Sequence, residues 1–186
     1  GTGNTIIGGQ AGDALTTGIQ NIAIGLTALS TEDTGSKSVA IGTAALRNQN
    51  YDGHAYNVAV GHDAGASVTS GTFNILIGGL AGDALTTSAG NVAIGYQSLT
   101  TQQTHGTNTA IGYRTLRDQN SSAYAYNVAV GYDAGKLVTT GIQNTILGGL
   151  AGDALTTGSA NVAIGYQALS SEAVSYTHLT LPTTVS

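Results

Sequence analysis

Side chains that could do chemistry are sparse in this chain, and their spacing fits neither a catalytic nor a metal-binding arrangement. The histidines do not have the spacing of a metal motif; they are His54, His62, His105 and His178. No set of Ser, His and an acidic residue recurs in a way that predicts a nucleophile. The sequence therefore predicts no catalytic residue and no enzyme activity in this region.

Aspartate and glycine patterns suggest two other chemistries, which the spacing also argues against. Asp13, Asp83 and Asp153 recur in Ala-Gly-Asp-Ala-Leu segments, but Ca²⁺ needs six to eight oxygen ligands, usually from several carboxylates together. The segment 131–137 looks like a phosphate-binding loop, yet it is one residue too short and has Leu137 where Ser or Thr should bind Mg²⁺. We interpret the aspartates as solvated turn residues or helix-like N-caps, and we expect no metal and no cofactor.

Composition excludes several further classes of protein. The 186 residues include 28 Gly, 1 Pro, 1 Phe and no Trp, Met or Cys, and only 8% are charged, with a formal net charge of −5. Without cysteine there are no disulfides and no zinc-thiolate sites. The five basic residues are dispersed, which argues against nucleic-acid binding, and no apolar run approaches the roughly 18 to 20 residues that cross a bilayer. The neutral, polar surface that remains suits an extracellular location.

A short repeated phrase is the strongest signal in the sequence. The phrase reads Asn, apolar, small, apolar, Gly, as in Asn21-Ile22-Ala23-Ile24-Gly25. The starts are Asn4, Asn21, Ser38, Asn57, Asn74, Asn91, Asn108, Asn127, Asn144 and Asn161. The intervals between these numbers run 17, 17, 19 and 17 and then repeat, and the four together make a larger period of 70. A fixed short period predicts a solenoid in which each unit stacks on its neighbours.

Within each phrase, the period-two alternation of apolar and small residues predicts a short β-strand. The third position after Asn is always Ile, Val or Leu, as at Ile24 and Ile94, and we expect this column to fill the interior. The second position, mostly Ala but Ile6, Leu76 and Ile146 in the first unit of each block, then faces outward. A strand that is apolar on both faces is covered on both sides. The pattern therefore predicts self-association, most economically around a symmetry axis.

The flanking residues predict how each turn closes. The Gly that ends every phrase suits a sharp corner or a close backbone approach, and stacked Asn side chains can hydrogen-bond along the column. After the next small residue, either Gly follows with a large aliphatic residue three positions later, or Leu follows at once. Each turn thus supplies one large aliphatic side chain to its layer.

The phrase Asn91-Val92-Ala93-Ile94-Gly95, followed three residues later by a small residue, resembles the head repeats of YadA-type trimeric autotransporter adhesins. Related repeats occur in phage tail-fibre proteins, and the resemblance covers residues 1 to about 174. It implies a left-handed parallel β-roll in which three chains associate about a common axis, outside the cell or on a virion. The adhesin head repeat is typically shorter than either unit of this chain, so the unit length favours the tail-fibre branch.

The C-terminal stretch 175–186 breaks every column of the repeat. It resembles the translation of a sequencing adapter, and we expect it to have no biological function. The repeat domain is accordingly predicted over residues 1–174, with a non-repeat tail at 175–186.

The third unit of each block is two residues longer, and the extra length predicts a protruding loop at 47–56 and at 117–126. Tyr, Arg and Asn together are typical of recognition surfaces, and loops on a rigid scaffold often carry binding. The candidate contact residues for a host-surface glycan or protein are Arg47, Tyr51, His54, Tyr56, Arg117, Tyr124 and Tyr126. A spacer loop without a specific role is the alternative. Tyr96, Tyr113, Tyr132 and Tyr166, each following a closing Gly, could form a separate stacked column.

Taken together, the sequence predicts an all-β parallel solenoid of about ten turns, roughly 45 to 50 Å long at 4.8 Å per turn, and one third of a homotrimer. The expected function is structural: a segment of an extracellular fibre, from a phage tail or a surface adhesin, that spaces or presents a receptor-binding region. Two alternatives are an ice-binding solenoid, which would need a flat Thr-x-Thr array, and a non-catalytic part of a carbohydrate-degrading tailspike. Nucleic-acid partners and membrane insertion are not expected.

Overall fold

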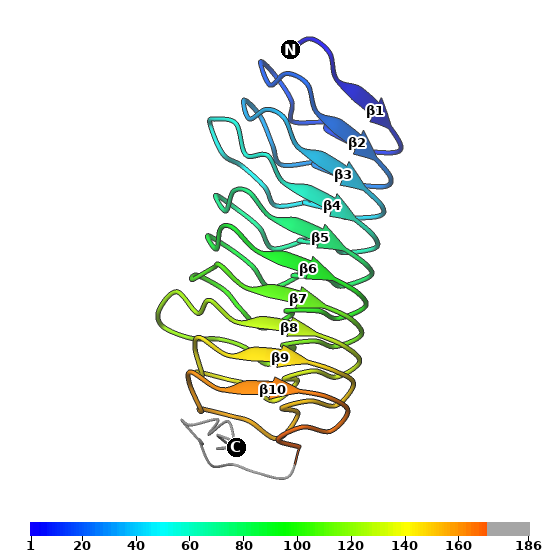
Figure 1. Cartoon of the computed structure of the whole chain (residues 1–186). Helices are drawn as coiled ribbons and strands as arrows, with labels where there is room; N and C mark the ends of the chain where they lie inside the picture. Colours follow the sequence, from blue (N-terminus) through cyan, green and yellow to red (C-terminus); the bar gives the residue numbers. More distant parts are fainter. Residues whose placement is uncertain (171–186) are drawn as a thin grey trace, which may run out of the picture.

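The protein is an all-β parallel solenoid, as the sequence predicts, and its described residues form about nine turns where about ten were expected (Figure 1). A computed structural model describes residues 1–170, so the predicted tail at 175–186 lies outside the described residues. Ten three-residue strands form one sheet in sequential order. They are β1 (Thr5–Ile7), β2 (Ile22–Ile24), β3 (Val39–Ile41), β4 (Val58–Val60), β5 (Ile75–Ile77), β6 (Val92–Ile94), β7 (Thr109–Ile111), β8 (Val128–Val130), β9 (Thr145–Leu147) and β10 (Val162–Ile164).

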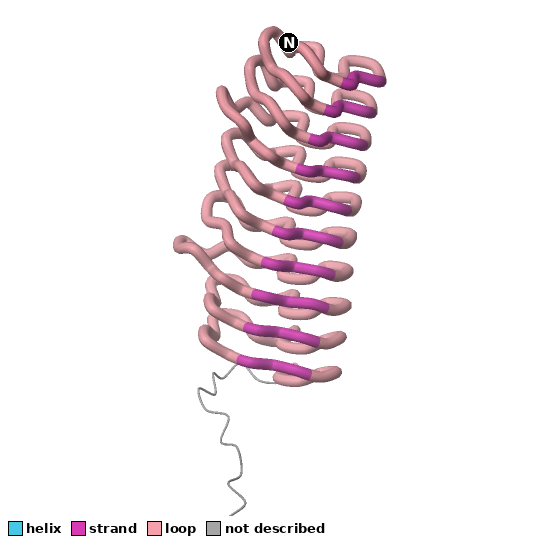
Figure 2. Tube along the Cα trace, turned by 45° about the horizontal axis from the view of Figure 1, so that its top comes forward, coloured by secondary structure: helices cyan, strands magenta, loops and turns pink. Residues whose placement is uncertain are grey.

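Every turn contributes one strand, and the remainder of each turn is loop that stacks on the loop before it (Figure 2). Register is the same in both unit lengths: Ile22 pairs with Val39 across a short unit, and Val39 pairs with Val58 across a long one. The two extra residues are accommodated entirely outside the strand. Among residues 1–170 there is no helix long and apolar enough to cross a membrane.

The prediction of which strand face lies inside was wrong. The second position of the phrase is buried, with Ala23, Ala40 and Leu76 fully inaccessible, whereas the first and third positions face outward. Alternation shows only that the two sets lie on opposite faces. The volume left in the interior decides which face of the strand is buried. The opposite wall of each turn already places a large side chain, such as Leu46, in this narrow interior. Ala on the strand leaves room for it.

Each layer of the core contains one large aliphatic residue from that opposite wall, as predicted. In some units this residue stands at the corner of the turn, and in the others it stands three residues later. In units of one kind a left-handed corner holds Gly82 and the aliphatic residue is Leu85, three positions later. In units of the other kind the corner holds Leu99, also left-handed at φ 55°, and a buried Gln102 stands three positions later. The pairs of the first kind are Gly12/Leu15, Gly65/Val68, Gly82/Leu85, Gly135/Val138 and Gly152/Leu155; those of the second are Leu29/Glu32, Leu46/Gln49, Leu99/Gln102 and Leu116/Gln119.

The closing glycine is required at its position for two reasons. Its φ lies between 121° and 141° in all ten units, a region that L side chains rarely adopt. A Cβ on Gly61 would also lie only 2.5 Å from the carbonyl oxygen of Gly78 in the next turn. The predicted close backbone approach is therefore confirmed.

The predicted asparagine ladder is present and buried. The backbone N–H of Asn74 donates to Oδ1 of Asn57 at 2.9 Å, and the Asn74 side-chain amide donates to the backbone carbonyl of Ser88 at 2.9 Å. Asn91 donates in turn to Oδ1 of Asn74 at 3.0 Å through both its backbone and its side-chain nitrogen. Each Asn thus fixes the start of its own strand and joins it to the turns on either side.

Candidate functional site

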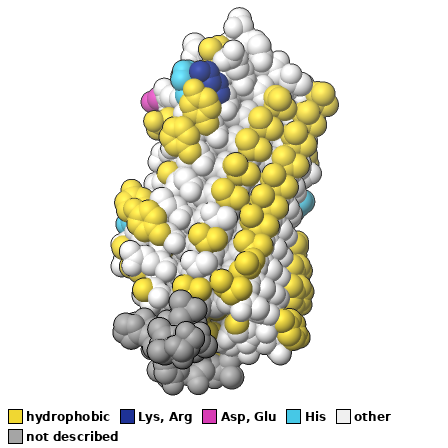
Figure 3. Space-filling model, in the orientation of Figure 1, with side chains coloured by type: hydrophobic (Ala, Val, Ile, Leu, Met, Phe, Trp, Pro, Cys, Tyr) yellow, Lys and Arg dark blue, Asp and Glu magenta, His cyan; other side chains and the backbone are white. Residues whose placement is uncertain are grey.

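The exposed face of the sheet is an apolar stripe along the length of the solenoid. It consists of the first and third strand positions, where the side chains are only Ile, Val, Leu and three Thr. Figure 3 shows these hydrophobic side chains as long columns over the strands. Within it, Ile77 in the middle is 37% exposed and Leu147 47%. A charge-free apolar surface of this length is typical of an interface rather than of a solvated sheet.

The first long loop carries an aromatic cluster on the edge of the solenoid. The His54 and Tyr56 rings meet edge to face at 5.9 Å, and the Tyr56 ring stacks on Phe73 with centroids 5.7 Å apart. Nζ of Lys37 lies 5.3 Å from the centre of the Tyr56 ring and donates to its hydroxyl at 3.2 Å. Lys37, Tyr56 and Phe73 thus present a cation, a phenol and a phenyl ring in successive turns. We call Lys37, His54, Tyr56 and Phe73 the first aromatic cluster.

Three members of the first aromatic cluster occupy a repeat position whose backbone is left-handed in every unit. Lys37, Tyr56 and Phe73 each directly precede a repeat phrase, and each has a left-handed φ of 52° to 65°. Bulky side chains are uncommon in that region, where Gly or Asn costs less. Phe73 is nevertheless 59% exposed, so its ring gains little from burial. Exposed aromatic rings that gain little from burial are candidates for contact with another molecule.

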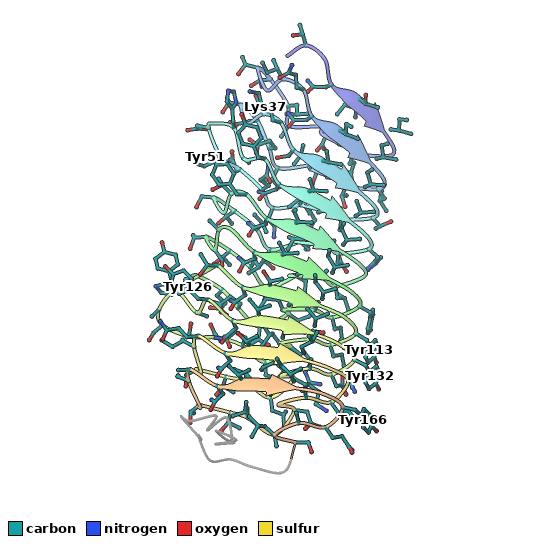
Figure 4. The ribbon with its side chains drawn as sticks, in the orientation of Figure 1. Lys37, Tyr51, Tyr113, Tyr126, Tyr132 and Tyr166 are labelled. Carbon is teal, nitrogen blue, oxygen red and sulfur yellow. The ribbon has the colours of Figure 1, made fainter. Side chains whose placement is uncertain are left out.

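The remaining residues predicted in the first loop lie apart from this cluster. Tyr51 covers Gly53, and its backbone N–H donates to the buried carboxylate of Glu32 at 3.3 Å. Arg47 is exposed at the start of the loop. Tyr51 and Lys37 both project from the loop edge in Figure 4.

The second long loop carries a related but looser cluster. The Tyr124 and Tyr126 rings are 6.3 Å apart and tilted by 40°, and His105 meets Tyr124 edge to face at 5.9 Å. Both tyrosines are exposed. Arg117 pairs through two hydrogen bonds of 2.7 and 2.8 Å with the neighbouring Asp118. We call His105, Tyr124 and Tyr126 the second aromatic cluster.

The predicted tyrosine column forms for three of its four members. Tyr96, Tyr113 and Tyr132 stack with centroids 5.6 and 5.2 Å apart, whereas Gly149 separates Tyr132 from Tyr166 by one turn. Figure 4 places the labelled tyrosines 113, 132 and 166 along the edge opposite the long loops.

Charges beside this tyrosine column form one compact group. Arg114 lies over the Tyr113 ring at 4.8 Å and donates two hydrogen bonds of 2.8 and 2.6 Å to the carboxylate of Asp133. Lys136 adds a contact of 3.3 Å to the same carboxylate. Burial alone would raise the pKa of Asp133, but the hydrogen bonds and charges of Arg114 and Lys136 outweigh it and hold that pKa below its usual value. Asp133 is therefore an anion that ties two neighbouring turns together.

Sequence reasoning missed Lys37, Phe73 and His105 as members of the aromatic clusters. Lys37 and Phe73 lie outside the long loops, in the turns before and after Tyr56. Their position in the repeat could have identified them, because Lys37, Tyr56 and Phe73 all stand directly before the repeat phrase. Residues at the same position of successive units stack in space. No group of three or more His, Asp or Glu side chains within residues 1–170 is arranged to hold a metal ion.

Comparisons with protein-family models, with curated proteins and with solved structures gave no match to this chain.

Proposed function

We propose that this chain is a structural segment of an extracellular fibre, on a virion or a cell surface, that associates with copies of itself through the exposed sheet face. The associated form is a homotrimer, and the two aromatic clusters on the loop edge beside the strands contact a host-surface glycan or protein. The apolar stripe is the observation that carries the proposal.

The size of the stripe supports association. Ten layers spaced by about 4.8 Å make it about 48 Å long, and two strand positions with their side chains make it roughly 10 Å wide. The resulting area, on the order of 500 Å², lies near the top of the range for single apolar patches on monomeric proteins.

The periodicity of the stripe supports a second copy as the occupant. The side chains repeat once per turn along the whole sheet. A partner can fill every layer only if its own side chains have the same spacing, and another copy of this chain has that spacing by construction. Cyclic association also lets identical stripes meet around one axis, which closes the assembly instead of leaving an apolar face exposed.

A rod built in this way suits a mechanical role. Continuous parallel strand pairing and the asparagine ladder link each turn to the next, so tension along the axis is resisted by many bonds per layer. The aromatic clusters lie on loops outside the strand ladder, where contact with another molecule does not disturb the pairing.

Light scattering coupled to size exclusion tests the proposal. We expect three times the chain mass for the natural sequence, and monomer with unchanged circular dichroism for Ile77→Lys, which places a charge in the middle of the stripe. Thr87→Lys is the matched control, because Thr87 is exposed on a loop and not on the stripe; it should remain associated. A monomeric natural protein, or unchanged association of Ile77→Lys, would overturn the proposal.

A further inference from the structure

The core of the first 70-residue block contains a complete polar network in its second and third units. The buried carboxylate of Glu32 accepts from the backbone N–H of Gly35 at 2.7 Å and from Nε2 of Gln49 at 2.9 Å. Gln49 Nε2 also donates to the Ser38 hydroxyl at 2.9 Å, and its Oε1 accepts from Asn57 at 2.8 Å. All four side chains are fully buried. Glu32 is thus the acceptor around which the network is organised.

The second block places a different set of side chains at the same positions. Seventy residues further on, Gln102 replaces Glu32 and Asn108 replaces Ser38, while Gln119 and Asn127 retain the types of Gln49 and Asn57. The bond from Asn127 to Gln119 Oε1 persists at 2.9 Å. Two acceptors of the first block, a carboxylate and a hydroxyl, have therefore become amides.

This exchange leaves buried polar atoms without partners. Gln102 Nε2, Gln102 Oε1, Asn108 Nδ2 and Gln119 Nε2 are all inaccessible and make no hydrogen bond to protein. Gln102 and Gln119 are 0% exposed and Asn108 is 1% exposed. The amides of Asn108 and Gln119 are fixed in orientation, because Asn108 Oδ1 already accepts from the Asn127 backbone at 3.2 Å and Gln119 Oε1 from the Asn127 side chain. Three donor groups and one acceptor thus remain in one part of the core.

We propose that a single water molecule is bound between Gln102, Asn108 and Gln119, at the place that the Glu32 network occupies in the first block. The contacts of Gln49 with both Glu32 and Ser38 show that these three positions converge on one point. Buried waters typically make about three hydrogen bonds to otherwise unpaired groups, and each group left unpaired costs about 1 to 3 kcal/mol.

The mixture of donors and acceptor selects water over an ion. A halide would accept from the three amide groups, but it would leave Gln102 Oε1 unpaired and would lose its own hydration in the core. A cation would face three N–H₂ groups. Water accepts two hydrogen bonds and donates two, so one molecule pairs with two of the amide donors and with the Gln102 oxygen, about the three hydrogen bonds of a typical buried water.

The water site also distinguishes the two long loops. In the first block Glu32 binds the backbone N–H of Tyr51 and so anchors the loop from below. In the second block the corresponding positions are Gln102 and Ser121, and no hydrogen bond joins them in the described residues. Glu32 is therefore a positioning residue for the first loop. Beneath the second loop its place is taken by the amide group of Gln102, which binds the proposed water.

Exchanging the two networks tests the proposal, with each block serving as the control for the other. High-resolution crystal structures would be compared for the natural chain, for Gln102→Glu/Asn108→Ser and for Glu32→Gln/Ser38→Asn. We expect water density about 2.7 to 3.2 Å from at least three of the four atoms in the natural chain. The first variant should lose it, and the second should gain an equivalent water in the first block.

A solution measurement accompanies the crystals. Oxygen-17 relaxation dispersion should count one fewer long-lived water per chain in Gln102→Glu/Asn108→Ser than in the natural protein. If Glu32→Gln/Ser38→Asn does not fold, the other two proteins decide. The proposal is overturned if the natural chain has no density at this point, if the density survives in Gln102→Glu/Asn108→Ser, or if crystals grown in bromide give an anomalous peak there.

Discussion

The strongest test of the layered core is an exchange of large side chains between strand and corner. Leu76 is fully buried on β5, where most other units have Ala. It fits because the corners of its own unit and of the preceding unit are glycine. A Cβ on Gly82 would lie 2.7 Å from Leu76 Cδ2 and 2.7 Å from Leu85 Cδ1, and a Cβ on Gly65 would lie 2.6 Å from Leu76 Cδ1. Leu76→Ala opens a cavity, and Gly82→Leu overfills the same space. Together the two changes move one large side chain from the strand to the corner, as in the next unit, which has Ala93 and Leu99.

The expected free energies of unfolding follow from this geometry. Leu76→Ala should cost about 2 to 5 kcal/mol, as for other buried Leu to Ala changes. Gly82→Leu should cost about 1 to 3 kcal/mol from overpacking, with no forbidden backbone, because Leu99 adopts the same left-handed conformation. The double variant should be more stable than the sum of the single effects predicts, by about 1 to 3 kcal/mol, since each change relieves the defect of the other.

Urea unfolding followed by far-ultraviolet circular dichroism, at one fixed protein concentration, measures the four stabilities of the cycle. The control pairs Leu76→Ala with Gly152→Leu, which has the same role as Gly82 but lies four turns away, about 19 Å along the axis. That pair should be additive within about 0.5 kcal/mol. Additivity of the Leu76 and Gly82 changes would refute the account of one shared space.

Three further predictions concern backbone and charge. Gly61→Ala should destabilise the protein by at least about 3 kcal/mol, because Gly61 has a φ of 141° and its Cβ would lie 2.5 Å from a carbonyl oxygen. The control, Gly90→Ala, should cost only about 1 kcal/mol, since a Cβ there meets one methyl group at 3.8 Å. Equal losses of stability in thermal melts would contradict this prediction. The depressed pKa of Asp133 means that its stabilising contribution is present above the ordinary Asp pKa of 3.8 and is lost as pH falls through the lower folded value. Asp133→Asn should therefore lower stability at pH 7 and flatten the acid limb of the stability profile, and an unchanged acid limb would argue against the ion pair with Arg114. Burial raises the pKa of Asp83 above its ordinary value, so Asp83→Asn should raise the urea midpoint at pH 7, and the gain should disappear below about pH 4, where the unfolded carboxyl also binds a proton; a gain that is independent of pH would show another cause.

Much of the fold could be predicted from the sequence, because a stacked repeat turns each position into a column. The strands, the close approach at glycines such as Gly61, and the asparagine ladder all followed from position in the unit. The inward face of the strand did not, since alternation is symmetric between the two faces. The decisive fact, that corner residues such as Leu46 already occupy the interior, depends on how far apart the walls of the turn lie.

The aromatic clusters were only partly predictable for a related reason. Reading the long loops as segments identified His54, Tyr56, Tyr124 and Tyr126, but contacts in a solenoid run between turns. Phe73 meets Tyr56 from the following turn, one whole repeat unit further along the sequence. Arg117, by contrast, was predicted to be available for recognition, but it pairs with its own neighbour, Asp118. Sequence spacing alone does not show whether such an arginine side chain is paired or free.

The order in which the two kinds of layer alternate also controls how the length of such a rod can change. Loss or duplication of a single repeat unit would bring together layers that do not normally meet. Loss of the unit that contains Gly65, for example, would place Leu76 beside the leucine corner at Leu46 instead of a glycine corner. Loss or duplication of a whole 70-residue block restores every neighbour relationship, because equivalent residues of successive blocks, such as Leu76 and Ile146, have the same surroundings. Genetic variants of this protein should therefore differ in the length of the solenoid by whole steps of about 19 Å, which is four layers of strand spacing.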